Sequence, residues 1–508
     1  MTRGAVAAGH PRTAEAAKLI LEAGGNAFDA ALAALCAACV VEPVLTSLGG
    51  GGFLLARRDS GETRLFDFFV QTPRRKRPVD QIDFHPIIAD FGTAQQEFHI
   101  GAGSIATPGT VRGLFDVHRR LGSIPMSAIL APAISYARDG VETNALQAYI
   151  FRIIAPIYVA TDEARRVYGR GQRRDRLCNE GELLRQPELA DALELLAIEG
   201  ERLFYEGEMA RSIVEECRLQ GGHLTGEDLE NYRTLIRRPL EQRYRASRVY
   251  TNPPPSSGGM LIRFAQQLLL AVEPSDITFG SSEHLLRLAL VMEQTNLARD
   301  RHAVHAEMLD EALLEKYRAV VRDHPVTARG TTHINVIDGE GNAASLTLSN
   351  GEGCGHLVPG TGIMLNNMLG EEDLNPGGFH RWQENVRVSS MMAPSLALED
   401  GRLIAIGSGG SNRLRTAILQ TLCNMIDFGM PVQQAVAAPR IHFERGLISI
   451  EPGFPQQSID ALIAAWPEYH LWQEKNLFFG GAHTVTFDGS NFDGAGDPRR
   501  GGVFLGVA

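Results

Sequence analysis

The chain has 508 residues, of which 44% are hydrophobic and 21% charged, and its formal net charge at pH 7 is −11. This composition is typical of a globular protein with a large core, and the negative charge argues against a nucleic acid or an anionic membrane as the main partner. The longest wholly apolar run, Ala30 to Val41, is too short to span a bilayer.

The six cysteines are too few for a disulfide framework in a chain of this length. Cys36 and Cys39 form a C-x-x-C pair, but they lie in the alanine-rich apolar run, where packing in a core helix explains them. No convincing set of metal ligands is found, so we expect no metal site. The N-terminus lacks a basic and apolar leader, which predicts a cytoplasmic location unless a leader has been removed.

The first predicted elements are helices. Residues 11–46 have a helical pattern in which Gly25 ends one helix and Asn26 caps the next. Four glycines, Gly49 to Gly52, then lead into an apolar strand, which indicates that the backbone passes close to another part of the molecule. They do not form a phosphate-binding loop, because the lysine and the Ser/Thr of that motif are absent.

The remaining elements change in character along the chain. Residues 110–240 are mainly helical by period, the loop "NPPPSSGGM" precedes a helix that runs to about Val272, and residues 283–322 are helical again. Beyond Val326 the chain predicts short strands and glycine turns, with one clear helix at Leu414–Phe428. No period of 20–50 residues repeats. Helices followed by a strand-rich last third predict an α+β or a layered α/β fold.

A hairpin is predicted about two-thirds of the way along the chain. His333–Asp338 alternates polar and apolar residues, Gly339–Asn342 has the composition of a turn, and Ala343–Ser349 resumes the alternation. Thr331 and Thr332 then stand at the start of the first strand. The preference of threonine for strands is the simplest explanation for them, and catalysis is the alternative.

Thr331 meets the needs of a nucleophile if the chain is cut before it. A threonine hydroxyl requires a base within hydrogen-bond reach, and its own α-amino group, with a pKa of about 7.7–8.0, can serve. That amine is free only once the peptide between Gly330 and Thr331 opens, and glycine tolerates the strained geometry of such a cut. Further along, in "IAIGSGGSNRLR", the amides of Gly409 and Gly410 can form an oxyanion hole, although a tight turn explains the same residues.

Several motifs, in order and spacing, resemble those of the γ-glutamyltranspeptidase family. The small subunit of that family is matched by "GTTHINVIDGEGNAASLT", "GIMLNNML", "RVSSMMAPS" and "GSGGSNR". The large subunit is matched by "AAGHPRTAEAA", "GGNAFDAALA", "GGGGF", "ATPGTVRG" and "YARDGV", and the C-terminal blocks by "APRIHFE" and "GAGDPRRGG". The resemblance covers essentially the whole chain.

The resemblance implies an N-terminal-nucleophile (Ntn) hydrolase. The expected fold is α/β (α+β), a four-layer αββα sandwich with two mainly antiparallel sheets between helical layers. Residues 1–330 would form the large-subunit region and residues 331–508 the small-subunit region, and the two would co-fold into one unit. The two fragments of one precursor would therefore stay associated. A higher oligomer is also compatible with the resemblance.

The resemblance also implies a reaction and its catalytic residues. Thr331 would be the nucleophile, Ser349 would stand where the family has a second threonine, and Gly409 and Gly410 would supply the oxyanion hole. Thr331 would attack a γ-glutamyl amide such as glutathione, an acyl-enzyme would form, and water or an amine would complete the turnover. Neither a metal nor an organic cofactor is implied.

The substrate-binding residues carried over from the family are Ser389, Ser390, Glu371 and Arg77. The first two, which are partners of the substrate's α-carboxylate, are unchanged. Glu371, in "NNMLGEE", replaces the aspartate that binds the substrate's ammonium group.

Other pocket positions depart further from the family pattern. The family's R-E-x-A-P and T-R-D segments, whose arginine holds the α-carboxylate, correspond here to "FDFFVQTPRRKRPVD". A strict count places Pro78 at the arginine, with Arg77 beside it. Gly351 replaces an asparagine that lines the pocket, and Met368 replaces a glutamine.

These departures leave alternatives open. Only 17 residues separate Glu371 from Ser389, which predicts a site without the lid loop of some members and admits other acyl groups, as in cephalosporin acylases and polyglutamate-processing enzymes. A second alternative is an uncleaved, non-catalytic homologue that binds a small molecule or a partner. A third is a cysteine hydrolase that uses Cys354 with His356.

Overall fold

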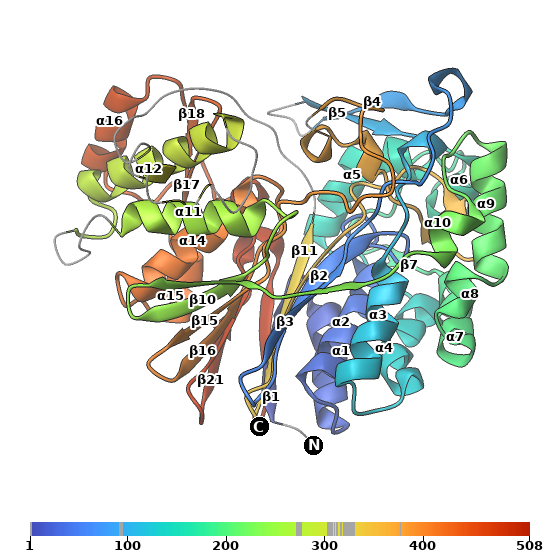
Figure 1. Ribbon diagram of the computed structural model, residues 1–508, viewed down its shortest axis with the longest axis horizontal. Helices are drawn as coiled ribbons and strands as arrows, with labels where there is room; N and C mark the ends of the chain where they lie inside the picture. Colours follow the sequence, from blue (N-terminus) through green and yellow to red (C-terminus); the bar gives the residue numbers. More distant parts are fainter. Residues whose placement is uncertain are drawn as a thin grey trace.

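The computed structural model describes residues 3–90, 95–270, 277–301, 331–375 and 377–508, together with positions 308, 310, 313, 314 and 317. Two antiparallel sheets lie at the centre of the molecule, and helices cover the outer side of each (Figure 1). The predicted α+β fold of the αββα type is confirmed. The two ends of the chain lie close together at one edge of the sheets (Figure 1), where the first and last strands pair.

The first sheet interleaves the two halves of the chain. Its strand order is β22-β1-β11-β12-β2-β3-β8, and all neighbouring strands are antiparallel. The strands are β1 (Gly4–Ala8), β2 (Gly51–Arg57), β3 (Thr63–Phe68), β8 (Leu235–Arg237), β11 (Thr332–Asp338), β12 (Ala343–Ser349) and β22 (Val503–Val507). The predicted hairpin is therefore confirmed as β11–β12, and it lies between β1 and β2 from the first part of the chain.

The second sheet has the order β21-β20-β16-β15-β10-β9 and is also antiparallel throughout. Its strands are β9 (Leu240–Tyr244), β10 (Ser247–Thr251), β15 (Ser395–Glu399), β16 (Arg402–Ile406), β20 (Thr484–Phe487) and β21 (Phe492–Ala495). Short strands outside the two sheets are β4 (His85–Asp90), β5 (Gln95–Ile100), β6 (Val141–Glu142), β7 (Leu183–Leu184), β13 (Leu357–Val358), β14 (Ile363–Met364), β17 (Ile441–Glu444), β18 (Leu447–Ile450) and β19 (Tyr469–Leu471).

Helices from the first half of the chain lie on the side of the first sheet (Figure 1). They are α1 (Pro11–Glu22), α2 (Ala27–Val41), α3 (Thr110–Leu121), α4 (Met126–Asp139), α5 (Ala145–Tyr158), α6 (Asp162–Tyr168), α7 (Pro187–Glu199), α8 (Arg202–Tyr205), α9 (Glu208–Leu219) and α10 (Gly226–Glu230). The second sheet is covered by α11 (Gly258–Leu269), α12 (Ser282–Arg301), α14 (Arg413–Ile426), α15 (Val432–Ala437) and α16 (Gln456–Ala465). Short 3-10 helices are η1 (Val79–Gln81), η2 (Ala102–Ser104), η5 (Met368–Gly370), η6 (Glu372–Leu374), η7 (Leu477–Phe479) and η8 (Pro498–Arg500).

The first two helices form where the sequence predicts them. The Asn26 side chain accepts hydrogen bonds from the amides of Phe28 and Asp29, both at 2.9 Å, and Asp29 accepts from the Asn26 amide in return. This is the reciprocal cap that satisfies the first amides of a helix. Every residue of α2 is buried, as its apolar sequence predicts. Within the residues described, no helix is both long and apolar enough to cross a membrane.

Some predictions fall outside the described residues. The helix predicted from residue 283 is present as α12, which is described as far as Arg301, and most positions from 302 to 330 are not described. Gly330, the residue before the predicted cut, is among them. The helix predicted to end near Val272 is described as far as Leu269.

Polar side chains in β11 and β12 connect the two sheets. Ile334 and Val336 belong to the core that includes α1 and α2. Asn335 and Ser345 instead form hydrogen bonds with residues of the second sheet or next to it. The Ser345 hydroxyl donates to the carbonyl of Ile406 at 3.1 Å, and the Asn335 amide donates to the carbonyl of His483 at 2.9 Å. Both faces of the hairpin are therefore buried, and these bonds hold the start of β11 close to the loop that follows β16.

Candidate active site

Thr331 precedes β11 and is 5% exposed. Thr332 pairs with Leu348, so one further step in this register places Ser349 opposite Thr331. The Ser349 hydroxyl accepts a hydrogen bond from the Gly351 amide at 3.0 Å. Both residues line one cavity, here named the Thr331 pocket, which is lined by Phe69, Thr331, Ser349, Met368, Glu371, Asp373, Leu374, Ser390, Met391, Met392, Ser411 and Leu414.

The glycines Gly49–Gly52, the last two of which begin β2, allow the backbone to lie close to the strand that carries Ser349. A side chain at Gly50 would overlap the carbonyl of Ser349, and one at Gly52 would overlap the carbonyl of Thr347. The predicted close approach of the backbone is confirmed. It allows β2 to pair with β12 as far as Ser349, which pairs with Gly51.

The glycine loop after β16 packs directly on Thr331. A side chain at Gly409 would overlap the Thr331 carbonyl oxygen, and Gly410 has a φ of +116°, which favours glycine. Within the described part of the chain, neither amide donates a hydrogen bond to another backbone or side-chain acceptor. Two amides beside Thr331 that have no acceptor among the described residues are compatible with the predicted oxyanion hole.

Arg500 contacts Thr331 from another direction. Its Nη1 donates to the Thr331 carbonyl at 3.2 Å. The guanidinium is buried, and burial lowers its pKa to about 10, with the carboxylates of Asp497 and Glu42 opposing that shift. It therefore stays charged at neutral pH. We did not predict this role, although Arg500 lies in the "GAGDPRRGG" block that supports the resemblance.

The second threonine of the pair is held by a buried carboxylate. The Thr332 hydroxyl donates to Glu42 Oε2 at 2.8 Å, and the Thr13 hydroxyl donates to Oε1 at 2.7 Å. Burial raises the pKa of Glu42, while these two hydroxyl donors and the charge of Arg500 oppose the shift. Thr332 thus anchors the start of β11 to the end of α2.

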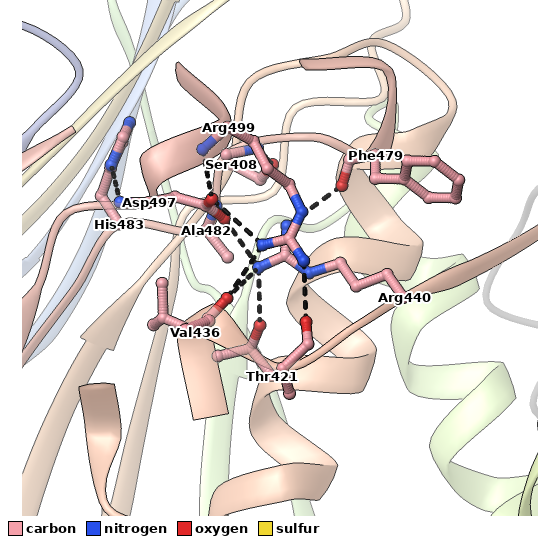
Figure 2. A network of polar contacts seen from close by, with 12 residues as sticks. Ser408, Thr421, Val436, Arg440, Phe479, Ala482, His483, Asp497 and Arg499 are labelled. Atoms are coloured by element: carbon pink, nitrogen blue, oxygen red, sulfur yellow. Dashed lines mark hydrogen bonds and ion pairs between the residues drawn. The ribbon is translucent and has the colours of Figure 1, made fainter. Parts of the chain in front are cut away.

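A buried ionic network supports the segment that carries Arg500 (Figure 2). Asp497 pairs with Arg440 at 2.7 Å and with Arg499 at 3.2 Å, and Arg499 also pairs with Glu451 at 2.5 Å. The Asp497 carboxylate accepts a further bond from the Ala482 amide at 2.8 Å. Burial alone would raise the pKa of Asp497, but the two arginines outweigh it and hold that pKa well below its usual value. The network holds the short helix η8 in place, and therefore also Arg500, its last residue.

The four predicted substrate-binding residues do not all line the Thr331 pocket. Glu371 and Ser390 line the Thr331 pocket. Ser389 is not among the described residues that line it, and its hydroxyl donates to the Pro255 carbonyl at 2.8 Å. Arg77 is also absent from the lining, because its guanidinium donates to carbonyls at the end of α9 and just beyond it, among them those of Cys217 at 3.1 Å and Gly222 at 3.2 Å. The structure therefore does not bring Arg77 to the pocket.

The cysteine-hydrolase hypothesis is wrong. Cys354 is buried, and burial raises the pKa of its thiol. The ring of His356 contacts Glu216 at 3.0 Å and Asp83 at 3.4 Å, whereas the Cys354 sulfur contacts the His356 backbone. A thiol that is neither ionised nor paired with the imidazole cannot act as a nucleophile.

The family model described as Gamma-glutamyltranspeptidase matches residues 13–507. This chain belongs to the gamma-glutamyltranspeptidase family. It is 32% identical to the Acylase ACY 1 proenzyme of Pseudomonas sp. (strain V22), over 96% of this chain and 90% of that protein. It is 29% identical to the Glutathione hydrolase proenzyme of Escherichia coli (strain K12), over 94% and 87% of the two chains.

A solved structure agrees with this membership of the gamma-glutamyltranspeptidase family. The cephalosporin acylase from Bacillus halodurans superposes with a TM-score of 0.86 at 25% identity, over 99% of this chain and 96% of that one. The predicted family is confirmed, and with it an enzyme that hydrolyses amides or transfers acyl groups.

Two departures from the gamma-glutamyltranspeptidase pattern are in contact with each other. A side chain at Gly351 would overlap Glu371 Oε1 and Asn367 Oδ1. The longer carboxylate of Glu371 thus uses space that Gly351 leaves empty. Phe69, from the stretch "FDFFVQTPRRKRPVD" that corresponds to the family's R-E-x-A-P and T-R-D segments, also lines the Thr331 pocket.

Gly351→Ala is expected to lower kcat/KM on the order of tenfold or more. Gly351 has a φ of +67°, which costs alanine roughly 1–2 kcal/mol, and the new methyl group would overlap both Asn367 Oδ1 and Glu371 Oε1. The rate of hydrolysis of γ-glutamyl p-nitroanilide measures the effect. Gly360→Ala is the matched control, because Gly360 has a similar φ of +73° and nothing within 4 Å of the added methyl group. Equal activity of the two variants would contradict the assigned contact between Gly351 and Glu371. Adding Glu371→Asp to Gly351→Ala should partly restore kcat/KM.

Proposed function

We propose that this chain opens between Gly330 and Thr331 and that Thr331 then acts as an N-terminal nucleophile on amide substrates. The position of Thr331 carries the proposal, because it lies in a pocket with the Gly409–Gly410 loop against its carbonyl. The names of the relatives, which are proenzymes, support a cut precursor.

The proposed reaction is acyl transfer through an ester. The α-amine of Thr331 takes the proton of its own hydroxyl as Oγ1 attacks the substrate carbonyl. The Gly409 and Gly410 amides bind the oxygen that becomes negative. The carbon–nitrogen bond breaks, the leaving amine takes the proton, and water or another amine then releases the acyl group. Ser349, opposite Thr331, is proposed to orient the nucleophile through its hydroxyl.

Two donor classes fit this mechanism. γ-Glutamyl amides such as glutathione are the first, supported by the family and by the Glutathione hydrolase proenzyme relatives. Amides of another acyl group are the second, supported by the acylase relatives and by Arg77, which binds helix-end carbonyls instead of lining the pocket.

The two fragments are proposed to remain one folded unit after the cut. β11 and β12 from residues 331–508 pair with β1 and β2 from residues 1–330, in the middle of the first sheet. Separating the fragments would break both ladders and expose both faces of the hairpin.

Purified protein is expected to yield two fragments, of 330 and 178 residues in a chain of 508, with Thr331 first in the second. Intact-mass spectrometry and N-terminal sequencing measure this, and γ-glutamyl p-nitroanilide hydrolysis is assayed on the same sample. A single uncut chain after long incubation, with no amide hydrolysis, would instead support the non-catalytic binding homologue. An uncut chain that hydrolyses the anilide would refute the proposed mechanism.

A further inference from the structure

The Thr331 pocket is acidic. Glu371 and Asp373 line it, and none of the other described residues that line it is a lysine, an arginine or a histidine. Glu371 is 6% exposed, so water screens its charge poorly. The hydroxyl of Ser411, which follows the glycine loop, donates to Asp373 at 3.1 Å and so ties this carboxylate to the loop beside Thr331.

Four described arginines that could bind a substrate carboxylate are engaged with other groups. Arg387, two residues before Ser389, contacts the carbonyl of Phe69, pairs with Asp67 at 3.4 Å and donates to the Arg233 carbonyl at 2.7 Å. Arg413, at the start of α14, donates to the Phe478 carbonyl at 3.1 Å. Arg77 binds carbonyls at the end of α9, and Arg500 donates to the carbonyl of Thr331 itself. All four guanidinium groups therefore bind backbone carbonyls.

The rest of the described pocket wall provides no cationic side chain, and its polar members, Thr331, Ser349, Ser390 and Ser411, carry only hydroxyl groups. It is mainly apolar, formed by Phe69, Met368, Leu374, Met391, Met392 and Leu414. Burying a carboxylate in such surroundings without a cationic partner is strongly unfavourable, and two carboxylates nearby add repulsion. An ammonium group has the opposite preference, because the same two carboxylates stabilise it.

We infer that the preferred acyl donor carries an ammonium group on a short aliphatic acyl chain and no carboxylate, as in amides of ω-amino acids. This inference rests on the proposed function, since it names the substrate class of the same site. Glu371 and Asp373 receive the ammonium group, and the apolar wall receives the methylene chain. Thr331 Oγ1 forms the ester to the acyl carbon, the amide carbon–nitrogen bond breaks, and the leaving amine takes the hydroxyl proton.

Four p-nitroanilides separate the two charges. The 4-aminobutyryl compound has the amine alone, the γ-glutamyl compound has both groups, the glutaryl compound has the carboxylate alone and the butyryl compound has neither. The expected order of kcat/KM, after subtraction of spontaneous release, is 4-aminobutyryl first and glutaryl last. The first should exceed the γ-glutamyl compound on the order of tenfold or more. A γ-glutamyl or glutaryl rate equal to or above the 4-aminobutyryl rate overturns the inference.

Variants test whether the charges of the Thr331 pocket cause the preference for the 4-aminobutyryl compound. Glu371→Gln and Asp373→Asn should each lower the ratio of the 4-aminobutyryl rate to the butyryl rate. Met391→Lys, at a partly exposed lining position, should raise the ratio of the glutaryl rate to the butyryl rate. Asp400→Asn, at an exposed turn between β15 and β16, is the matched control and should leave all ratios unchanged. Unchanged ratios in all three pocket variants overturn the inference.

Binding distinguishes failure of the inference from failure of the proposed function. If γ-glutamyl anilide is hydrolysed fastest, the inference fails and the proposed function stands. If no anilide is hydrolysed, the proposed function fails, and titration calorimetry with the same four compounds still tests the pocket. Tighter binding of the 4-aminobutyryl than of the glutaryl compound then supports the inference, and the reverse order overturns it.

Discussion

Thr331→Ala is expected to leave the chain in one piece and to lower amide hydrolysis on the order of 10⁴-fold or more, because in the proposed mechanism processing and turnover both need the Thr331 hydroxyl. The alanine keeps the backbone that packs against Gly409 and that accepts from Arg500, so the fold should survive. Denaturing electrophoresis, intact-mass spectrometry and an anilide assay on the same preparation measure both losses.

Thr332→Ala is the matched control for Thr331→Ala. It removes the neighbouring hydroxyl, which donates to the buried Glu42 carboxylate, and should cost roughly 1–3 kcal/mol of unfolding free energy. It should still be cut before Thr331 and should keep its amidase activity. A Thr331→Ala chain that is still cut and active would contradict the role assigned to Thr331. A Thr332→Ala chain that folds but is neither cut nor active would contradict the role assigned to Thr332.

Asp497→Asn is expected to lower the free energy of unfolding by about 3–5 kcal/mol, the usual cost of removing one partner from a buried ion pair. Arg440, which pairs with Asp497 at 2.7 Å, is 1% exposed and would keep its charge without that carboxylate. The amide is nearly the same size, so the loss reports on charge more than on packing. Urea denaturation at fixed protein concentration measures the effect.

Asp400→Asn serves as the surface control, because Asp400 is exposed and such changes usually stay within about 0.5 kcal/mol. A second readout follows from the position of Arg500 next to Arg499. If the network positions Arg500, Asp497→Asn should also slow anilide hydrolysis. A fully active Asp497→Asn variant with wild-type stability would show that the network has neither role.

The parts of the fold that local sequence determines were predicted well. The β11–β12 hairpin has alternation and a glycine turn, and the cap of α2 uses Asn26, a signal contained in a few residues. The close approach at Gly49–Gly52 was also predicted, because four successive glycines have few other physical explanations. What the backbone approaches, namely β12 and β14, required the structure.

The parts of the site that depend on distant contacts were not predicted. Arg77 is one residue from the position counted for the family's arginine, yet its side chain reaches the end of α9, because the nearby carbonyls of that helix accept its hydrogen bonds. Phe69 and Asp373 enter the pocket from segments about 300 residues apart. No periodicity or spacing within one segment indicates such a meeting. The placements of Thr331, Ser349, Glu371 and Ser390 are compatible with their predicted roles, which activity measurements must test.

The interleaved strand order of the first sheet has a consequence for how a cut molecule recovers from denaturation. Before the cut, β1, β11, β12 and β2 are joined in one polypeptide, and refolding is a first-order process. Afterwards, the centre of the sheet must be rebuilt from two separate polypeptides, so the yield of recovered enzyme depends on dilution. Harsh treatment that an uncut chain survives would thus permanently inactivate the mature enzyme when it is scarce.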